Sequence, residues 1–134
     1  MKISNLRKHF IYILAIGINL FLLVFFIGSI WIGYEAKNNC QNAQDQYGGD
    51  CIEALIEQLN DDNQNYRVRN NAIWSLGQFG DSRATSALEE FYSGNIPNKE
   101  PLDKTISQYE LKKAINLTNG GLNLPALIWR TSSK

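Results

Sequence analysis

The sequence has a single histidine, two cysteines and no excess of either charge sign among its 134 residues. The histidine, His9, precedes a long apolar stretch, so the rest of the chain cannot form a His-based catalytic triad or metal cluster. Glycines do not form a phosphate-binding loop either, because Gly48-Gly49 and Gly120-Gly121 are isolated pairs. These absences predict a protein that is not an enzyme and that binds no cofactor or small-molecule substrate.

Basic residues are also scarce where nucleic acid would need them. All 13 Asp and Glu residues lie from Glu35 onward, whereas Lys2, Arg7 and Lys8 precede the apolar stretch. The larger part of the chain is therefore mildly acidic, and phosphate backbones require a basic face. No nucleic-acid partner is expected.

One acidic run copies part of a calcium loop. Asp61-Asp62-Asn63-Gln64-Asn65 supplies oxygen-bearing side chains at positions 1, 3 and 5. Tyr66 replaces the glycine of the turn, and Ala72 replaces the bidentate glutamate. No metal site is predicted.

Residues 10–34 form an uncharged apolar run whose one amide is Asn19. A helix crosses the hydrocarbon core with about 20 apolar residues, whereas the core of a cleaved signal has about 7–15. The run is too long for a signal, and Tyr34-Glu35-Ala36 is not a small-x-small cleavage site. A single uncleaved transmembrane helix is predicted at 10–34.

The flanks of this run predict its orientation. Three cations precede it and only Lys37 lies close after it. The positive-inside bias places residues 1–9 in the cytoplasm as a short tail and everything after the span outside the cytoplasm.

Two interpretations of the small and polar residues in the span stay open. Asn19 and Gly17, together with Gly28 and Gly33, could pack the helix against another membrane protein. Alternatively, the helix is a plain anchor that tolerates one amide and three glycines.

Cys40 and Cys51 suit an oxidising compartment as a disulfide, or else they are two packed thiols. Ala36, Cys40, Ala43 and Tyr47 recur at helical spacing and predict a polar capping helix at 35–49. If that helix ran unbroken to Tyr47, Cys40 would lie about 10 Å from the following turn. A bridge would then require the helix to end early; otherwise the cysteines stay apart.

Residues 50–121 divide into helices at their turn residues. Asp50 and Glu53 form a capping box before a helix whose apolar face is Ile52, Leu55, Ile56 and Leu59. Its companions Glu53, Glu57 and Gln58 are expected to face solvent. Further helices are predicted at 66–79, ended by Gly80, at 82–91, and at 105–118, with an apolar capping tail at 122–134.

The central part of this segment resembles a known repeat. Val68-Arg69, Ala72, Leu76-Gly77-Gln78-Phe79-Gly80-Asp81, Ala84 and Leu88 follow the pattern of a HEAT repeat. The resemblance covers Leu55 to Leu88 and is closest to the short bacterial type seen in phycobilisome-lyase-like proteins. A weaker echo at Tyr109-Glu110-Leu111-Lys112 marks a second repeat. The resemblance implies an all-α fold: a transmembrane helix followed by a short α-solenoid of about two HEAT-like helical hairpins.

Such repeats leave one helix face exposed, which the resemblance places at Arg67, Asn70, Asn71, Trp74 and Gln78. An aromatic side chain among hydrogen-bonding groups is typical of a binding hot spot, although Trp74 could instead pack under the capping helix or the tail. The sequence thus predicts a membrane-anchored, non-catalytic module that binds a protein partner through this face. One alternative is an accessory subunit held mainly by its membrane helix, and a less favoured one is a bilin-lyase-like enzyme.

Overall fold

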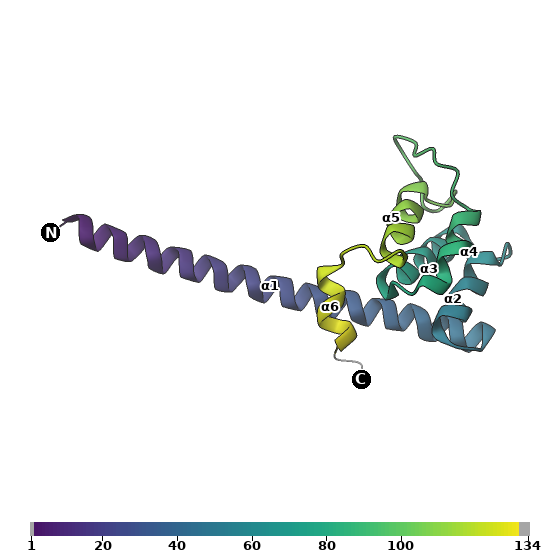
Figure 1. Cartoon of the computed structure of the whole chain (residues 1–134), viewed down its shortest axis with the longest axis horizontal. Coiled ribbons are helices and arrows are strands. Elements are labelled where there is room, and N and C mark those ends of the chain that lie inside the picture. The colour runs from purple at the N-terminus through teal and green to yellow at the C-terminus, as the bar shows by residue number, and fades with distance from the viewer. Residues whose placement is uncertain (1, 132–134) are drawn as a thin grey trace.

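The computed structural model describes residues 2–131, and all elements of this part of the chain are helical. They are α1 (Lys2–Tyr47), α2 (Cys51–Asn60), α3 (Tyr66–Phe79), the 3-10 turn η1 (Ser82–Ala84), α4 (Thr85–Glu90), α5 (Gln108–Thr118) and α6 (Leu124–Thr131). Helices α2 and α3 pack as a hairpin against the C-terminal end of α1, and α5 packs on α3 and on α4 at the far side of that hairpin (Figure 1). The predicted all-α class with a short solenoid is confirmed.

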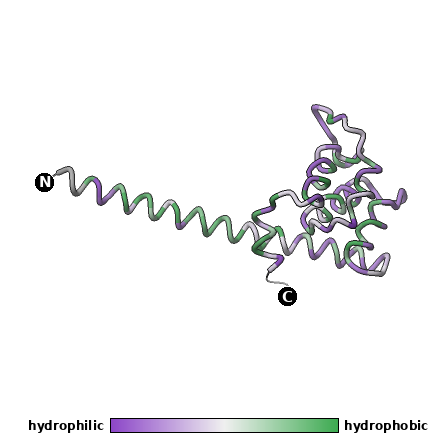
Figure 2. The backbone as a smooth tube through the Cα atoms, viewed as in Figure 1, coloured by the Kyte–Doolittle hydropathy of each residue, from purple (hydrophilic) through white to green (hydrophobic). Residues whose placement is uncertain are grey.

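Helix α1 runs without a break through the expected boundary at residue 34. Its N-terminal part projects alone from the stacked helices (Figure 1) and is mostly apolar after its first few turns (Figure 2). It is the one described helix that is long and apolar enough to cross a membrane, and its most apolar window is 0% buried. The polar helix predicted at 35–49 is therefore the last part of α1, and it forms one wall of the stacked module.

The local signals for α2 and α3 act as the sequence predicts. The Asp50 carboxylate accepts from the backbone N–H groups of Ile52 and Glu53, and the Glu53 carboxylate in turn accepts from the Asp50 N–H. At the other end of the hairpin, Gly80 adopts φ 63°, a left-handed conformation that ends α3. The buried side chains of the hairpin share one core with those of α4 and α5, among them Leu55, Leu76 and Leu111.

Helix α5 begins at Gln108 rather than at Thr105, which corrects the predicted start. The Ser107 side chain caps it by accepting from the Glu110 N–H. Glu100, in the preceding loop, accepts from Ser107 Oγ at 2.6 Å and from the N–H groups of Gln108 at 2.6 Å and Tyr109 at 3.2 Å. A carboxylate on the first N–H groups of a helix is stabilising, so these contacts fix where α5 starts.

Low pH should weaken the contacts that Glu100 makes with the start of α5. Burial would raise the pKa of Glu100, but its bonds from Ser107, Gln108 and Tyr109 hold it below the ordinary value. Stability from a lowered carboxylate pKa is present above the unfolded value, about 4.3, and is lost as pH falls through the folded one. We expect Glu100→Gln to lower the free energy of unfolding by about 1 kcal/mol at pH 7. In urea titrations the difference from the parent chain should vanish on acidification below the folded pKa. The exposed Glu90→Gln is the control, and a deficit that stays constant into acid would contradict the prediction.

The predicted capping tail forms α6, which lies across α1 (Figure 1). A Cβ atom added to Gly33 would come within 2.5 Å of Trp129, so the absence of a side chain at Gly33 lets the two helices touch. Ala36, Ala126 and Trp129 form a second small core here, with Phe79 packed against it. The close approach that the sequence assigned to a membrane partner is thus made, at Gly33, within the chain.

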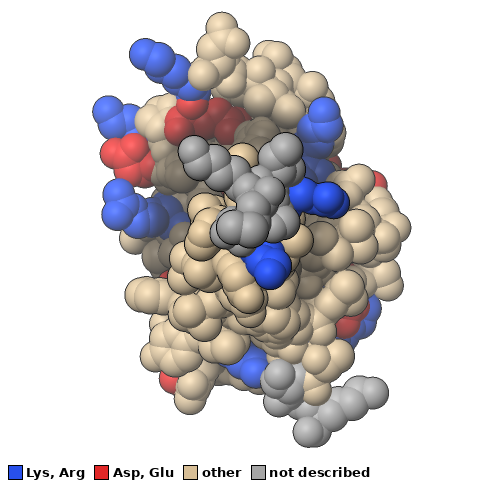
Figure 3. All heavy atoms as spheres, turned by 90° about the vertical axis from the view of Figure 1, so that its left-hand side faces the viewer, with Lys and Arg blue, Asp and Glu red and all other residues tan. Residues whose placement is uncertain are grey.

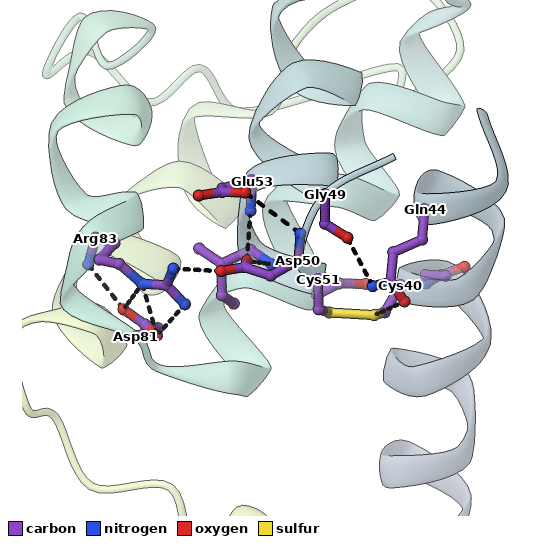
Figure 4. The surroundings of a disulfide bond; sticks show 11 residues. Cys40, Gln44, Gly49, Asp50, Cys51, Glu53, Asp81 and Arg83 are labelled. Atoms are coloured by element: carbon purple, nitrogen blue, oxygen red, sulfur yellow. Dashed lines mark hydrogen bonds and ion pairs between the residues drawn. A yellow bond between two sulfur atoms is a disulfide. The ribbon is translucent and has the colours of Figure 1, made fainter. Parts of the chain in front are cut away.

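Cys40 and Cys51 form a disulfide with their Cα atoms 5.3 Å apart, although α1 continues to Tyr47 (Figure 4). The expectation that an unbroken helix keeps the cysteines apart is wrong. Gly48 and Gly49 both have positive φ, 75° and 73°, and reverse the chain so that it returns along α1. Gln44 Nε2 donates to the Gly49 carbonyl at 3.1 Å and holds the returning segment against the helix.

Candidate functional site

The five residues predicted to form a binding face do not share one surface. Arg67 and Asn71 are exposed as expected. The expectation that Asn70 and Gln78 are exposed is wrong, because both are buried. Trp74 is half-buried and packs against the small core of α1 and α6. Trp74 therefore packs beside the C-terminal tail, as the second interpretation of this residue held.

Asn70 is buried because it holds the loop before α5. Its Nδ2 donates to the carbonyls of Leu102 at 3.0 Å and Thr105 at 2.8 Å, and its Oδ1 accepts from Ser107 N–H at 2.9 Å. These partners lie 32 to 37 positions away in the sequence. A buried amide that satisfies three backbone groups has a structural role.

Gln78 is buried because α6 and the segment before it pack against this residue. Its Oε1 accepts from Asn123 Nδ2 at 3.0 Å, and its backbone carbonyl accepts from Arg130 Nε at 3.0 Å. A cation on the last carbonyls of α3 also suits the helix dipole. Trp74 and Gln78 line an apolar hollow of about 450 Å³ with residues of α6 and of the segment before it.

A different surface gathers uncharged polar side chains. Two rows of side chains face each other across a groove of about 260 Å³ between α1 and α3, with one residue of α2 between them. One row is Asn39, Asn42 and Gln46, at spacing i, i+3, i+7; the other is Gln64, Val68 and Asn71, at spacing i, i+4, i+7. Asn39, Asn42 and Gln46 therefore lie on one face of α1, and Val68 and Asn71 on one face of α3, whereas Gln64 lies in the turn before α3. Six of the seven lining residues are amides and none is charged.

Gln58, from α2, is the amide between the rows. It is 6% exposed, and the structure of residues 2–131 gives its side chain no hydrogen bond. Its carboxamide is not fully enclosed, because its polar atoms still reach the solvent in the groove. Gln58 is therefore largely buried rather than on the outer surface, which corrects the expectation that it faces solvent, and its polar end is open to the groove.

The amides at the edges of the groove are held by neighbours. Asn39 Nδ2 donates to Ser75 Oγ at 3.0 Å, and Gln64 Nε2 donates to the Tyr47 hydroxyl at 3.0 Å. Each therefore uses its NH₂ group inside the module and keeps its carbonyl oxygen as an acceptor. Asn42 and Asn71 make no side-chain hydrogen bond within the described residues and offer both donors and acceptors.

A tyrosine–aspartate pair fixes Gln64. The Tyr47 hydroxyl donates to Asp61 Oδ2 at 2.7 Å. Burial and this bond to Asp61 raise the pKa of Tyr47, and the bond from Tyr47 lowers the pKa of Asp61. At neutral pH the tyrosine is therefore a neutral donor and the aspartate an ionised acceptor, so the hydroxyl is left to accept from Gln64.

The residues predicted to pack the membrane helix are separate from the groove. Asn19 Nδ2 donates to the Ala15 carbonyl of its own helix at 2.8 Å. A Cβ atom added to Gly17 or Gly28 would meet nothing within 4 Å, so both open to the surroundings of α1. Their role as a packing face stays a prediction.

Residues 36–96 match the family model described as HEAT repeats. The matched range holds the end of α1, the hairpin of α2 and α3, and α4, so it includes every residue that lines the groove. HEAT repeats are in general protein-interaction modules. No curated protein and no solved structure matches the chain.

Proposed function

We propose that this chain is a membrane-anchored binding module whose amide-lined groove holds an extended segment of a partner protein. The observation that carries the proposal is Gln58, a largely buried amide that makes no hydrogen bond within the described residues and whose polar end opens to the groove among five other amides. Each carboxamide offers a donor and an acceptor, the pair of groups that a peptide backbone also presents. The groove and an extended backbone are therefore complementary in chemistry.

The length of the groove and its lack of charge limit which segments of a partner protein could bind there. The row on α1 spans seven positions of the helix, a length of about 10 Å, which accommodates about three residues of extended chain. No charged side chain lines the groove, so an ionised side chain of the partner would lose its hydration without gaining an opposite charge. We expect the bound segment to be neutral where it enters the groove.

The anchor is proposed from α1. Its most apolar window is not covered by the rest of the chain, and the run from 10 to 34 ends with Trp31 and Tyr34, aromatic residues of the kind found at membrane–water interfaces. The cations before the span favour a cytoplasmic N-terminus. The Cys40–Cys51 disulfide supports the same orientation, because disulfides persist in oxidising compartments outside the cytoplasm.

The surroundings of Gly17 in α1 favour a second candidate function. The apolar hollow around this residue, lined by Phe10, Leu14 and Phe21 among others, is a place where a second membrane helix could approach. The chain would then be an accessory subunit held mainly by α1. No observation on the described residues favours the bilin-lyase-like alternative, and it is not carried further.

Replacing Gln58 with leucine separates binding from stability. Leucine removes a carboxamide that makes no hydrogen bond within the described residues, so the free energy of unfolding should change by less than about 1 kcal/mol, while the loss of its hydrogen bonds to the partner weakens binding. The measurement compares the urea midpoint with the yield of partner that co-purifies after mild detergent extraction. Gln41→Leu is the matched control, because Gln41 is an exposed amide of α1 that does not line the groove.

The outcome distinguishes the two candidates. Reduced co-purification with Gln58→Leu, but not with Gln41→Leu, supports the groove. Unchanged co-purification with both variants would contradict it. Loss with a Gly17→Leu variant alone would support the accessory-subunit candidate.

A further inference from the structure

Helix α6 has an apolar face that nothing in the described chain covers. Ala126 and Trp129 are buried against α1, whereas Leu124 and Leu127 are 53% and 58% exposed. Leu122, just before the helix, is also exposed. A short helix with one face packed and another face of exposed leucines requires a second apolar environment.

The position of α6 along α1 indicates what that environment is. Helix α6 touches α1 at Gly33, which lies about 35 Å along the helix from Phe10. The hydrocarbon core of a bilayer is about 30 Å thick, so a span that begins near Phe10 ends a few ångströms before the crossing point. Trp31 and Tyr34 are both 68% exposed at this level, as expected at a headgroup boundary.

The arrangement of the two helices fits the same boundary. Helix α6 runs across α1 rather than along it, so a membrane crossed by α1 would have α6 in its plane (Figure 1). Ser29, one turn before Gly33, is buried, which shows that the covered part of α1 extends from the crossing toward the apolar segment.

Charge around α6 also favours a lipid surface. No aspartate or glutamate follows Glu110 in the sequence, whereas Lys112, Lys113 and Arg130 do follow it. The view along α1 from its N-terminal side shows Lys and Arg side chains spaced around the rim of the module, some of them beside Asp and Glu side chains, with a broad uncharged area inside the rim (Figure 3). Cations beside an apolar helix face attract anionic headgroups and orient an interfacial helix.

We propose that α6 is an interfacial helix, with Leu124 and Leu127 inserted at the boundary between headgroups and acyl chains. It would then fix the angle between the membrane and the repeat module through its contacts with Gly33 and Gln78. This inference rests on the proposed membrane span of α1. It is independent of what the amide-lined groove binds.

The test uses the full chain in vesicles of phosphatidylcholine and phosphatidylglycerol, with the Cys40–Cys51 disulfide left oxidised. The environment-sensitive fluorophore NBD is attached to one introduced cysteine at a time: Leu127→Cys on α6, Leu102→Cys in the loop before α5, and Leu23→Cys in the apolar part of α1. Leu102 is the matched control, because it is an exposed leucine of the same chain, 48% exposed against 58% for Leu127. Lipids with a doxyl quencher at a shallow or a deep acyl position report the depth of each fluorophore.

The proposal predicts blue-shifted emission and quenching by shallow doxyl lipid at position 127, no quenching at 102, and quenching by deep doxyl lipid at 23. Quenching at 23 without quenching at 127 would overturn the interfacial role of α6 and leave the span intact. Blue-shifted emission at 127 that no doxyl lipid quenches would also overturn it, and would assign this face to a second copy of the chain. Failure to quench position 23 would overturn the span and this inference together.

Discussion

Replacing Arg69 with methionine is expected to lower the free energy of unfolding of the repeat module by about 3 kcal/mol. The guanidinium is 6% exposed, and its Nε donates to the Leu59 carbonyl at 2.8 Å. Methionine fills much of the same space but leaves that carbonyl, at the end of α2, without a donor. The ion pair from Nη1 to Asp62 contributes less, because Asp62 is 89% exposed and water screens it.

The control for this prediction lies two positions earlier in the same helix. Arg67 is exposed and makes no hydrogen bond with residues 2–131, so Arg67→Met should change the free energy of unfolding by less than about 0.5 kcal/mol. Urea unfolding of the full chain in detergent micelles, followed by circular dichroism, measures both variants. Equal midpoints for the two variants would show that the buried bond to Leu59 does not hold α2 and α3 together.

Removing the disulfide is expected to have an effect of similar size. The double variant Cys40→Ser, Cys51→Ser should lose about 3 kcal/mol, because the bridge closes a short loop in the unfolded chain. The sequence separation of the two cysteines is 11 residues. The bridge also pins the start of α2 beside α1, next to the Arg83 guanidinium that bonds both Asp50 and Asp81 (Figure 4).

Reduction of the parent chain supplies an independent measurement. A phosphine reductant should lower the urea midpoint of the parent chain to that of the double variant and should leave the double variant unchanged. If the reductant does not shift the parent midpoint, Cys40 and Cys51 are packed thiols, and one argument for the extracytoplasmic orientation is lost with the bridge.

The sequence predicts best those features whose cause is local. The Asp50 capping box and the left-handed Gly80 each depend on residues within a few positions, and both are found where the pattern placed them. The apolar spacing of α2 and α3 likewise predicted much of the core, including Leu55 and Leu76. These signals were enough to indicate a HEAT-like hairpin.

The features that were missed depend on distant partners. Asn70 and Gln78 resemble surface amides in the sequence, but their partners lie 32 to 45 positions away and bury them. Gln58 lies off the apolar face of its helix and was therefore expected in solvent, but in the fold it lies between α1 and α3 at the groove. The one sequence signal for the groove is the row Asn39, Asn42, Gln46 at helical spacing, and its meaning depends on the facing row from α3.

The central claim is that the groove, rather than the membrane helix, contacts the partner. The most direct test places a photoreactive amino acid at position 71 or 19 of the full chain and irradiates intact membranes. The account predicts a dominant adduct from position 71, at the groove, that disappears in the Gln58→Leu background and persists in the Gln41→Leu background. An adduct from position 19 alone, with none from position 71, would contradict the account and place the contact in the membrane.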